Sequence, residues 1–373
     1  MGSGFNFFTN VIDKTPGTAG SWQDVDVSGN GVPSGATGVI LKIVNTSATG
    51  RAEARKNGSS DDFGLNLPAN YFRFAFVGLD ENRVFEAYVG NTNIKIYLIG
   101  YCDENCGFFT NAIEKTVTAD DTWRDIDASG DIPAGATGAV CCLYNDSTST
   151  DYYVGIRKNG SISTLTRGRC TYNRRYTFQL CGVDGNRVFE GLRGNTAVHI
   201  MLIGYTKNPI TFFTDPVDKS LSQTSQWTDI DVTNDTDPAA DGAILFMRNS
   251  SSSTNPYGDS RKNGSSDDHS TYGRFAYNEC RGAAVGLDAG QVFEGWIDNT
   301  VLDFYLIGYC KPSAILKEVT DSVGLADNVT VNKVLQITET INLVEIIQAG
   351  VGGTKKTKLF LTLGDMAVQL TGE

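Results

Sequence analysis

Acidic and basic side chains that could do chemistry recur at fixed places along this 373-residue chain. Two Asp residues, two positions apart, follow a Trp three times: Asp24 and Asp26, Asp125 and Asp127, Asp229 and Asp231. Three further positions recur with them: Asp80, Asp184 and Asp288; Glu86, Glu190 and Glu294; Arg55, Arg157 and Arg261. Carboxylates that gather in pairs could cleave a glycosidic bond or bind Ca²⁺.

A structural role is the interpretation that we favour for these residues. A catalytic pair is needed once in a chain, whereas a device that stabilises a fold must recur in every copy. Asp side chains accept hydrogen bonds in turns, and Arg forms charge-assisted bonds with Glu. We expect three partly buried pairs: Arg55 with Glu86, Arg157 with Glu190, and Arg261 with Glu294. We expect no catalytic residue, cofactor or metal ligand, and Ca²⁺ binding is the alternative.

These residues belong to a module of about 100 residues that is present three times. The phrase Arg-Lys-Asn-Gly-Ser begins at Arg55, Arg157 and Arg261, and each copy opens with Phe-Phe-Thr and ends with Leu-Ile-Gly-Tyr. We predict modules at 1–104, 105–208 and 209–312, followed by a tail at 313–373. A module of this size can bury its own core, and the period is too long for a solenoid unit. The modules are therefore predicted to be separate beads along the chain.

Each module is predicted to be a β-sandwich of seven or eight short strands, so the fold class is all-β. Val39, Leu41 and Ile43 alternate with other residues, which gives a strand one apolar face. The segment 94–99 becomes apolar on both faces, as in a central or covered strand. Asn-Gly turns separate such segments, and no segment has the spacing of an amphipathic helix. The pattern fits both a sandwich and a jelly roll.

Composition excludes several classes of protein. The net charge of −12, from 31 basic and 43 acidic residues, argues against a nucleic-acid partner. No apolar run is long enough for a membrane helix, and no leader precedes the first module, which indicates synthesis in a cytoplasm. The eight Cys residues do not recur with the module, so we expect reduced core or linker residues and not disulfides or zinc ligands. His199 and His269 lie far apart and outside any catalytic motif, so no enzyme is predicted.

Aromatic residues give a weaker signal for binding. Trp22, Trp123 and Trp227 hold equivalent positions, and we expect them to pack in the core or between sheets and not to form a sugar platform. Several Tyr residues fall where the copies differ most: Tyr152, Tyr153, Tyr172, Tyr176 and Tyr257. Variable loops on a fixed scaffold are where binding is expected.

The tail has a different pattern, because pairs of apolar residues recur in it every six residues. The pairs are Val323 and Leu325, Val329 and Val331, Leu335 and Ile337, and Ile341 and Leu343. One long strand that pairs with another chain, a β-solenoid or intertwined trimeric shaft, and a small fourth domain all fit this period. In the first two cases the tail is an assembly element. Residues 355–370 predict a final hairpin that turns at Gly364 and Asp365.

Two tail phrases carry a resemblance to a known class of protein. Val319-Thr-Asp-Ser-Val-Gly-Leu-Ala-Asp-Asn-Val-Thr-Val-Asn-Lys resembles Asp-Ser-Val repeats of bacteriophage structural proteins, and Thr357-Lys-Leu-Phe-Leu-Thr-Leu-Gly-Asp-Met-Ala-Val-Gln-Leu is similar to the ends of some of them. The tandem modules look like the β-sandwich units of phage decoration and fibre proteins. The resemblance implies a particle protein and supplies no catalytic residues.

The resulting prediction is a non-enzymatic structural protein at a virion surface, made in the host cytoplasm. It would act as a capsid decoration or a head or tail fibre, anchored by its tail to other virion proteins. A homo-oligomer is expected, with a trimer as one arrangement, and neither nucleic acid nor membrane is a partner. A carbohydrate-binding adhesin that recognises a host glycan is the second hypothesis. A β-sandwich hydrolase is the third, and it needs an open carboxylate pair in one copy only.

Overall fold

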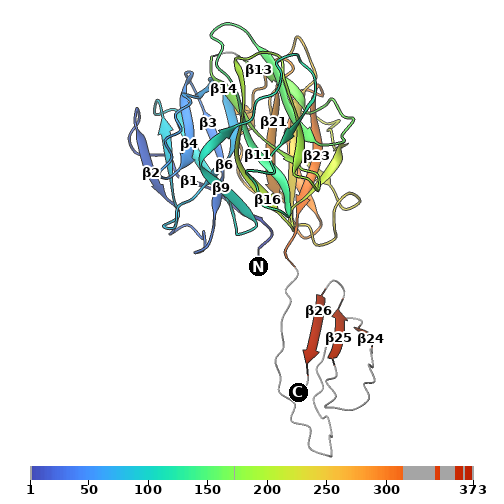
Figure 1. The fold of residues 1–373 in the computed structure, drawn as a ribbon. Helices are drawn as coiled ribbons and strands as arrows, with labels where there is room; N and C mark the ends of the chain where they lie inside the picture. Colours follow the sequence, from blue (N-terminus) through green and yellow to red (C-terminus); the bar gives the residue numbers. More distant parts are fainter. Residues whose placement is uncertain (1, 172, 314–340, 345–357, 364–365, 372–373) are drawn as a thin grey trace, which may run out of the picture. The chain divides into compact units, whose positions relative to one another are not determined.

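The computed structural model describes residues 2–171, 173–313, 341–344, 358–363 and 366–371 (Figure 1). These residues form β-strands in several sheets, with one 3₁₀ turn at Ser270–Tyr272 and no α-helix, which confirms the all-β class. In this described part, no helix has the length and apolar character needed to cross a membrane. Gly2–Pro312 form one compact unit, and residues from Ser313 onward belong to a second unit.

The first repeat consists of two four-stranded layers that pack face to face. Its strands are β1 (Phe5–Asp13), β2 (Trp22–Asp26), β3 (Gly38–Asn45), β4 (Gly50–Lys56), β5 (Asn66–Leu67), β6 (Tyr71–Gly78), β7 (Val84–Val89) and β8 (Ile94–Cys102). The inner sheet has the order β1-β8-β3-β6, and the outer layer has the order β2-β7-β4-β5. The outer layer continues from β5 into β14 (Arg175–Gly182) of the second repeat, which pairs parallel to it, so one eight-stranded sheet crosses between the two repeats. Neighbouring strands in both are antiparallel. Strand β8 is central, as its apolar sequence indicated.

The second repeat has the same strand order, and the third has it without a counterpart of β5. The second contains β9 (Cys106–Glu114), β10 (Arg124–Asp127), β11 (Ala136–Asn145), β12 (Tyr152–Lys158), β13 (Arg167–Cys170), β14 (Arg175–Gly182), β15 (Val188–Arg193) and β16 (Val198–Lys207). The third contains β17 (Thr211–Asp218), β18 (Trp227–Asp231), β19 (Gly242–Asn249), β20 (Gly258–Lys262), β21 (Cys280–Gly286), β22 (Val292–Ile297) and β23 (Leu302–Cys310). Their inner sheets run β9-β16-β11-β14 and β17-β23-β19-β21.

The three repeats close into a ring, so the prediction of separate beads is wrong. Phe108 of the second repeat lies against Gly38 and Gly78 of the first, where a Cβ atom would collide with its ring. Phe212 packs in the same way on Gly138 and Gly182. Phe7 completes the cycle on Gly242 and Gly286 of the third repeat. We call the three contact surfaces seam 1/2, seam 2/3 and seam 3/1.

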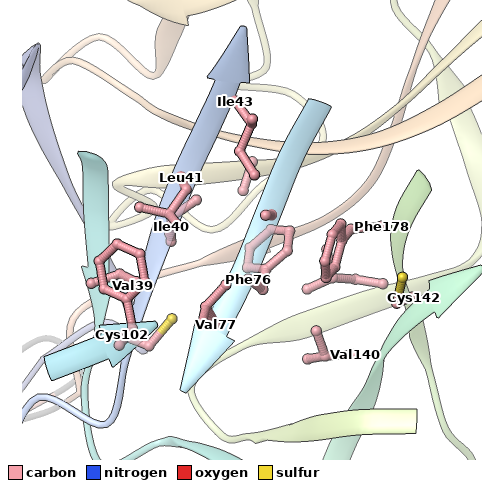
Figure 2. Close-up of a cluster of buried hydrophobic side chains, with 14 of the residues drawn as sticks. Val39, Ile40, Leu41, Ile43, Phe76, Val77, Cys102, Val140, Cys142 and Phe178 are labelled. Carbon is pink, nitrogen blue, oxygen red and sulfur yellow. The ribbon is translucent and has the colours of Figure 1, made fainter. Parts of the chain in front are cut away.

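The inner sheets have two buried faces, which explains why the repeats associate. Every residue of β3 is buried, including the alternate set that contains Ile40. Figure 2 shows residues of the first repeat, among them Phe76, beside Val140, Cys142 and Phe178 of the second, in one buried cluster. One face of β3 packs in its own sandwich and the other covers a neighbour. Strands β6, β14 and β21 contact one another where the three repeats meet.

The cysteines and the tail complete the described chain. All eight cysteines are buried free thiols, as predicted for core residues. In the tail, β24 (Ile341–Val344), β25 (Lys358–Leu363) and β26 (Met366–Thr371) form an antiparallel sheet. Strands β25 and β26 make the predicted final hairpin. Ile341 and Leu343 lie in β24, whereas Val323, Leu325, Val329, Val331, Leu335 and Ile337 lie outside the described residues.

A chain that ends at residue 208 tests the ring. Removing the third repeat uncovers the seam faces of the other two, which costs apolar burial. We expect a lower thermal midpoint than for residues 1–312, together with binding of a hydrophobic dye. Equal midpoints and no dye binding would show that the first two repeats do not depend on the third.

Candidate functional site

The recurring Arg and Glu residues meet on the exposed face of each outer sheet. Arg55 faces Glu86 on the neighbouring strand, and its Nε donates to Glu86 Oε2 at 2.9 Å. The equivalent distance is 2.8 Å from Arg157 to Glu190 and 2.8 Å from Arg261 to Glu294. A second bond from Nη2 makes each pair bidentate, at 3.4, 3.2 and 3.2 Å. All six side chains are partly buried, between 11% and 17% exposed.

Each of these arginines also holds the loop after its own turn. In the second and third repeats its Nη1 donates to the carbonyl oxygen six residues later, at 2.6 Å for Ser163 and 2.7 Å for Asp267. Arg55 makes the same bond to Asp61. The guanidinium is thus occupied by a carboxylate and a carbonyl. This arrangement fixes a strand pair and a loop and leaves little donor capacity for a ligand.

The recurring tryptophans lie over these arginines and not in the core, which corrects the expectation from the sequence. The guanidinium carbon lies 3.9 Å from the ring centre of Trp22, 4.3 Å from that of Trp123 and 3.9 Å from that of Trp227. All three rings are half-buried. A cation over an indole face adds to the strength of the ion pair beneath it.

The recurring aspartates stabilise turns. Asp184 accepts bonds from the N–H groups of Asn186 at 2.9 Å and Val188 at 2.8 Å, and from the Asn159 side chain at 2.9 Å. Asn159 is the Asn of the Arg-Lys-Asn-Gly-Ser phrase, so this contact ties two turns together. The Val188 N–H bond, helped by Asn159, lowers the pKa of Asp184. Asp80 and Asp288 make the same three kinds of bond.

The Asp pair beside each Trp is split between two roles. Asp26, Asp127 and Asp231 each accept the backbone N–H two residues later, at 2.7, 2.7 and 2.8 Å. Asp24, Asp125 and Asp229 are exposed on the outer sheets. Within the described residues, no group of three or more His, Cys, Asp or Glu side chains is placed to hold a metal ion.

The Ser of the repeated phrase contacts the next repeat across each seam. Ser59 donates to Asn111 Oδ1 at 3.0 Å and Ser161 donates to Asp215 at 2.7 Å. Ser265 donates to Asn10 at 3.2 Å and closes the cycle. The sequence reasoning missed these acceptors, although an Asn or Asp follows Phe-Phe-Thr in every copy. The phrase that marks the repeats therefore also joins them.

A buried ionic cluster lies where the three repeats meet. Arg73 forms an ion pair with Glu279 and donates to the Tyr176 carbonyl at 2.6 Å, so it joins all three repeats. Arg281 lies 3.5 Å from the same Glu279 and packs 3.8 Å from the Phe275 ring centre. Burial and the charge of Arg73 lower the pKa of Arg281 to about 9. Thr177 holds the position in the second repeat that Arg73 and Arg281 hold in the others.

Seam 3/1 contains a second buried ion pair, between Lys42 and Asp259. Small cavities lie at each seam, of about 50, 20 and 40 Å³ at seams 1/2, 2/3 and 3/1. Ligand pockets usually occupy roughly 300–1,000 Å³, so these cavities fit only water-sized occupants. His269 lines the one at seam 3/1, where burial and then Lys42 lower its pKa to about 4.

Other residues that the sequence singled out do not gather into a site. His199 lies between two carboxylates, with Nδ1 2.9 Å from Glu114 and Nε2 3.3 Å from Asp146, and far from His269 in the sequence. Tyr152 and Tyr153 are in β12 and Tyr257 precedes β20, all half-buried. Tyr176 is fully buried in β14 and is not part of a variable binding loop. Tyr172 lies outside the described residues.

Comparisons with known proteins give little further information. No family model matches the chain, and no curated protein matches it. Among solved structures, one match is titled "Life in the extremes: atomic structure of Sulfolobus Turreted Icosahedral Virus". It has 11% sequence identity and a TM-score of 0.20, and covers 78% of this chain and 83% of the other. At that TM-score the likeness supports no conclusion about fold or function.

Substituting Arg157 tests the role of the outer-sheet cluster. Arg157→Met leaves Glu190 without its partner and Ser163 without its donor, so we expect a loss of roughly 1–3 kcal/mol in unfolding free energy. Urea unfolding measures this loss. Asp125→Asn, on the same exposed face, should change stability by less than about 0.5 kcal/mol. Equal effects of the two variants would contradict the structural role.

The buried ionic cluster predicts a non-additive result. Glu279→Leu leaves Arg73 and Arg281 uncompensated in the core, which should cost roughly 3–5 kcal/mol. Replacing all three residues, as Arg73→Met, Glu279→Leu and Arg281→Met, should restore most of that stability, because no buried charge remains. A triple variant as unstable as the single one, measured by urea unfolding, would show that the charges themselves are required.

Proposed function

We propose that this chain is a non-enzymatic structural protein of a virion surface, a capsid decoration or a fibre of bacteriophage type. The observation that carries the proposal is that one chain closes three equivalent β-sandwiches into a ring. The recurring residues that could take part in chemistry make structural contacts. The Arg–Glu pairs join strands within a sheet, the Asp residues accept hydrogen bonds in turns, and the Ser residues donate across seams. This arrangement suits a protein that displays its surface to other molecules, and not one that surrounds a substrate.

The strand order supports the jelly-roll form of the proposal. The first two repeats each have eight strands in two layers, and successive strands pass from one layer to the other except between β4 and β5, which gives β1-β8-β3-β6 against β2-β7-β4-β5 in the first repeat. This order is that of a double Greek key, the topology of jelly rolls in viral capsids and lectins. Three jelly rolls around one axis resemble a trimer, here built within one polypeptide.

The positions of the first and last strands, and of the variable loops, favour an arrangement in which the ring unit is displayed on the particle and the tail anchors it. Cys310, at the end of β23, lies 3.7 Å from the carbonyl of Phe5, at the start of β1, so the chain enters and leaves at one end. We call this end the base. The loops in which the copies differ most, near residues 46–49, 146–151 and 250–257, follow strands that run away from the base. We propose that the tail attaches to the particle and that the distal loops face outward.

A truncation separates anchoring from display. The full chain and residues 1–312 are compared by light scattering for oligomeric state, and by co-sedimentation with particles of the virus that encodes the chain. We expect the full chain to assemble and to sediment with particles, and the truncated chain to remain a folded monomer that does not. If both chains are monomers and both bind particles, the anchoring proposal fails. A glycan-array signal from residues 1–312 would favour the adhesin alternative.

A further inference from the structure

An open depression of about 860 Å³ lies at seam 1/2, much larger than the cavities inside the seams. Its floor is apolar and comes from both repeats: Leu79 from the first, and Phe108, Phe109, Ile132 and Tyr205 from the second. Phe109 and Tyr205 pack against each other with tilted rings, whose centres are 6.2 Å apart. Both are half-buried, so one side of the pair faces the depression. A partly exposed aromatic floor of this kind is typical of a surface that binds a partner.

The rim of the depression is acidic. Its lining includes four carboxylates, Asp80, Glu81, Glu104 and Asp131, against one ammonium group, that of Lys56. Three of the five charged groups are already used within the fold. Asp80 accepts hydrogen bonds in its turn, Asp131 forms an ion pair with Lys115, and Lys56 donates to the Phe108 carbonyl at 3.1 Å. Glu81 and Glu104 are exposed and form no ion pair with any described residue.

The other two seams show that these two carboxylates are not part of the repeat. The aromatic floor recurs, as Phe212, Phe213 and Tyr309 at seam 2/3 and as Phe7, Phe8 and Tyr101 at seam 3/1, with ring pairs 5.9 and 6.1 Å apart. Glu81 is replaced by Gly185 and Ala289, and Glu104 by Asn208 and Ser3. The aromatic floor therefore belongs to the repeated module, whereas Glu81 and Glu104 are particular to seam 1/2.

We infer that the depression at seam 1/2 binds a cationic segment of a partner protein, in which Lys or Arg alternates with apolar residues. Its apolar side chains would cover the Phe109–Tyr205 pair, and its cations would meet Glu81 and Glu104. The ammonium of Lys207 already lies 5.5 Å from the Tyr205 ring centre, so the partner's apolar side chains, and not its cations, would contact this ring. The depression includes the turn between β8 and β9 at the base. The identification of the partner as a protein of the particle rests on the proposed function. The depression at seam 1/2 does not depend on that function.

A peptide titration of the full chain tests the inference. The probe is a fluorescent hexapeptide in which lysine alternates with leucine and phenylalanine, and its binding is followed by anisotropy at low salt. We expect one site per chain, weakened about tenfold in the Glu81→Gln, Glu104→Gln double variant because complementary charges are lost. The matched control is Asp24→Asn, Asp125→Asn, which removes the same charge from the exposed outer sheets and should change affinity less than about twofold. Thermal unfolding checks that all variants are folded.

Several results would overturn the inference. They are no binding, equal weakening by both pairs of substitutions, no weakening by either pair, or three sites per chain. A second peptide with serine in place of the apolar residues should bind at least about tenfold more weakly, and equal affinity would exclude a role for the aromatic floor. Because the titration uses no particles, its outcome is independent of the co-sedimentation test of particle attachment.

Discussion

The fold depends on one steric fit, in which a phenylalanine from each repeat occupies a space that two glycines leave on the preceding repeat of the ring. Phe108 fills the space at Gly38 and Gly78, and the fit repeats around the ring. Any side chain at those glycines would hold the repeats apart, and the second face of each inner sheet would lose its cover. The three repeats are therefore one compact unit, held together by contacts across each seam as well as within each sandwich.

A single chain can do what a trimer of identical subunits cannot: place different residues at equivalent positions on the axis. Identical subunits would bring three copies of Arg73 together without a countercharge. Here Thr177 replaces one of them, and Glu279 lies where the first repeat has Tyr71 and the second has Arg175. A buried charge is costly unless it is paired, and the differences between the three repeats at these positions provide that pairing. The same freedom allows seam 1/2 to have Glu81 and Glu104, which the other two seams lack.

The sequence predicted the units better than their assembly. Its alternating strands, Asn-Gly turns and recurring Arg and Glu residues indicated the sandwiches and which side chains face each other, because these depend on local spacing. The ring was missed because only one face of Val39–Asn45 was counted as apolar, although Ile40 and Val44 on the other face carried the signal for a second packing partner. Glu279 and Arg73 could not be found from repetition, since the copies differ there, and they are 206 residues apart in the chain.

Ring closure can take place only after the third repeat has been synthesised. During synthesis the first repeat emerges with Phe7 and Lys42 uncovered, and their partners Gly286 and Asp259 are made more than two hundred residues later. Until then the apolar sheet face around Phe7 lacks the third repeat that covers it in the folded ring. Contacts so distant in sequence form slowly, and chains translated close together on one message could exchange third repeats before each ring closes. The spacing of ribosomes on the message would thus affect how many chains close their own ring.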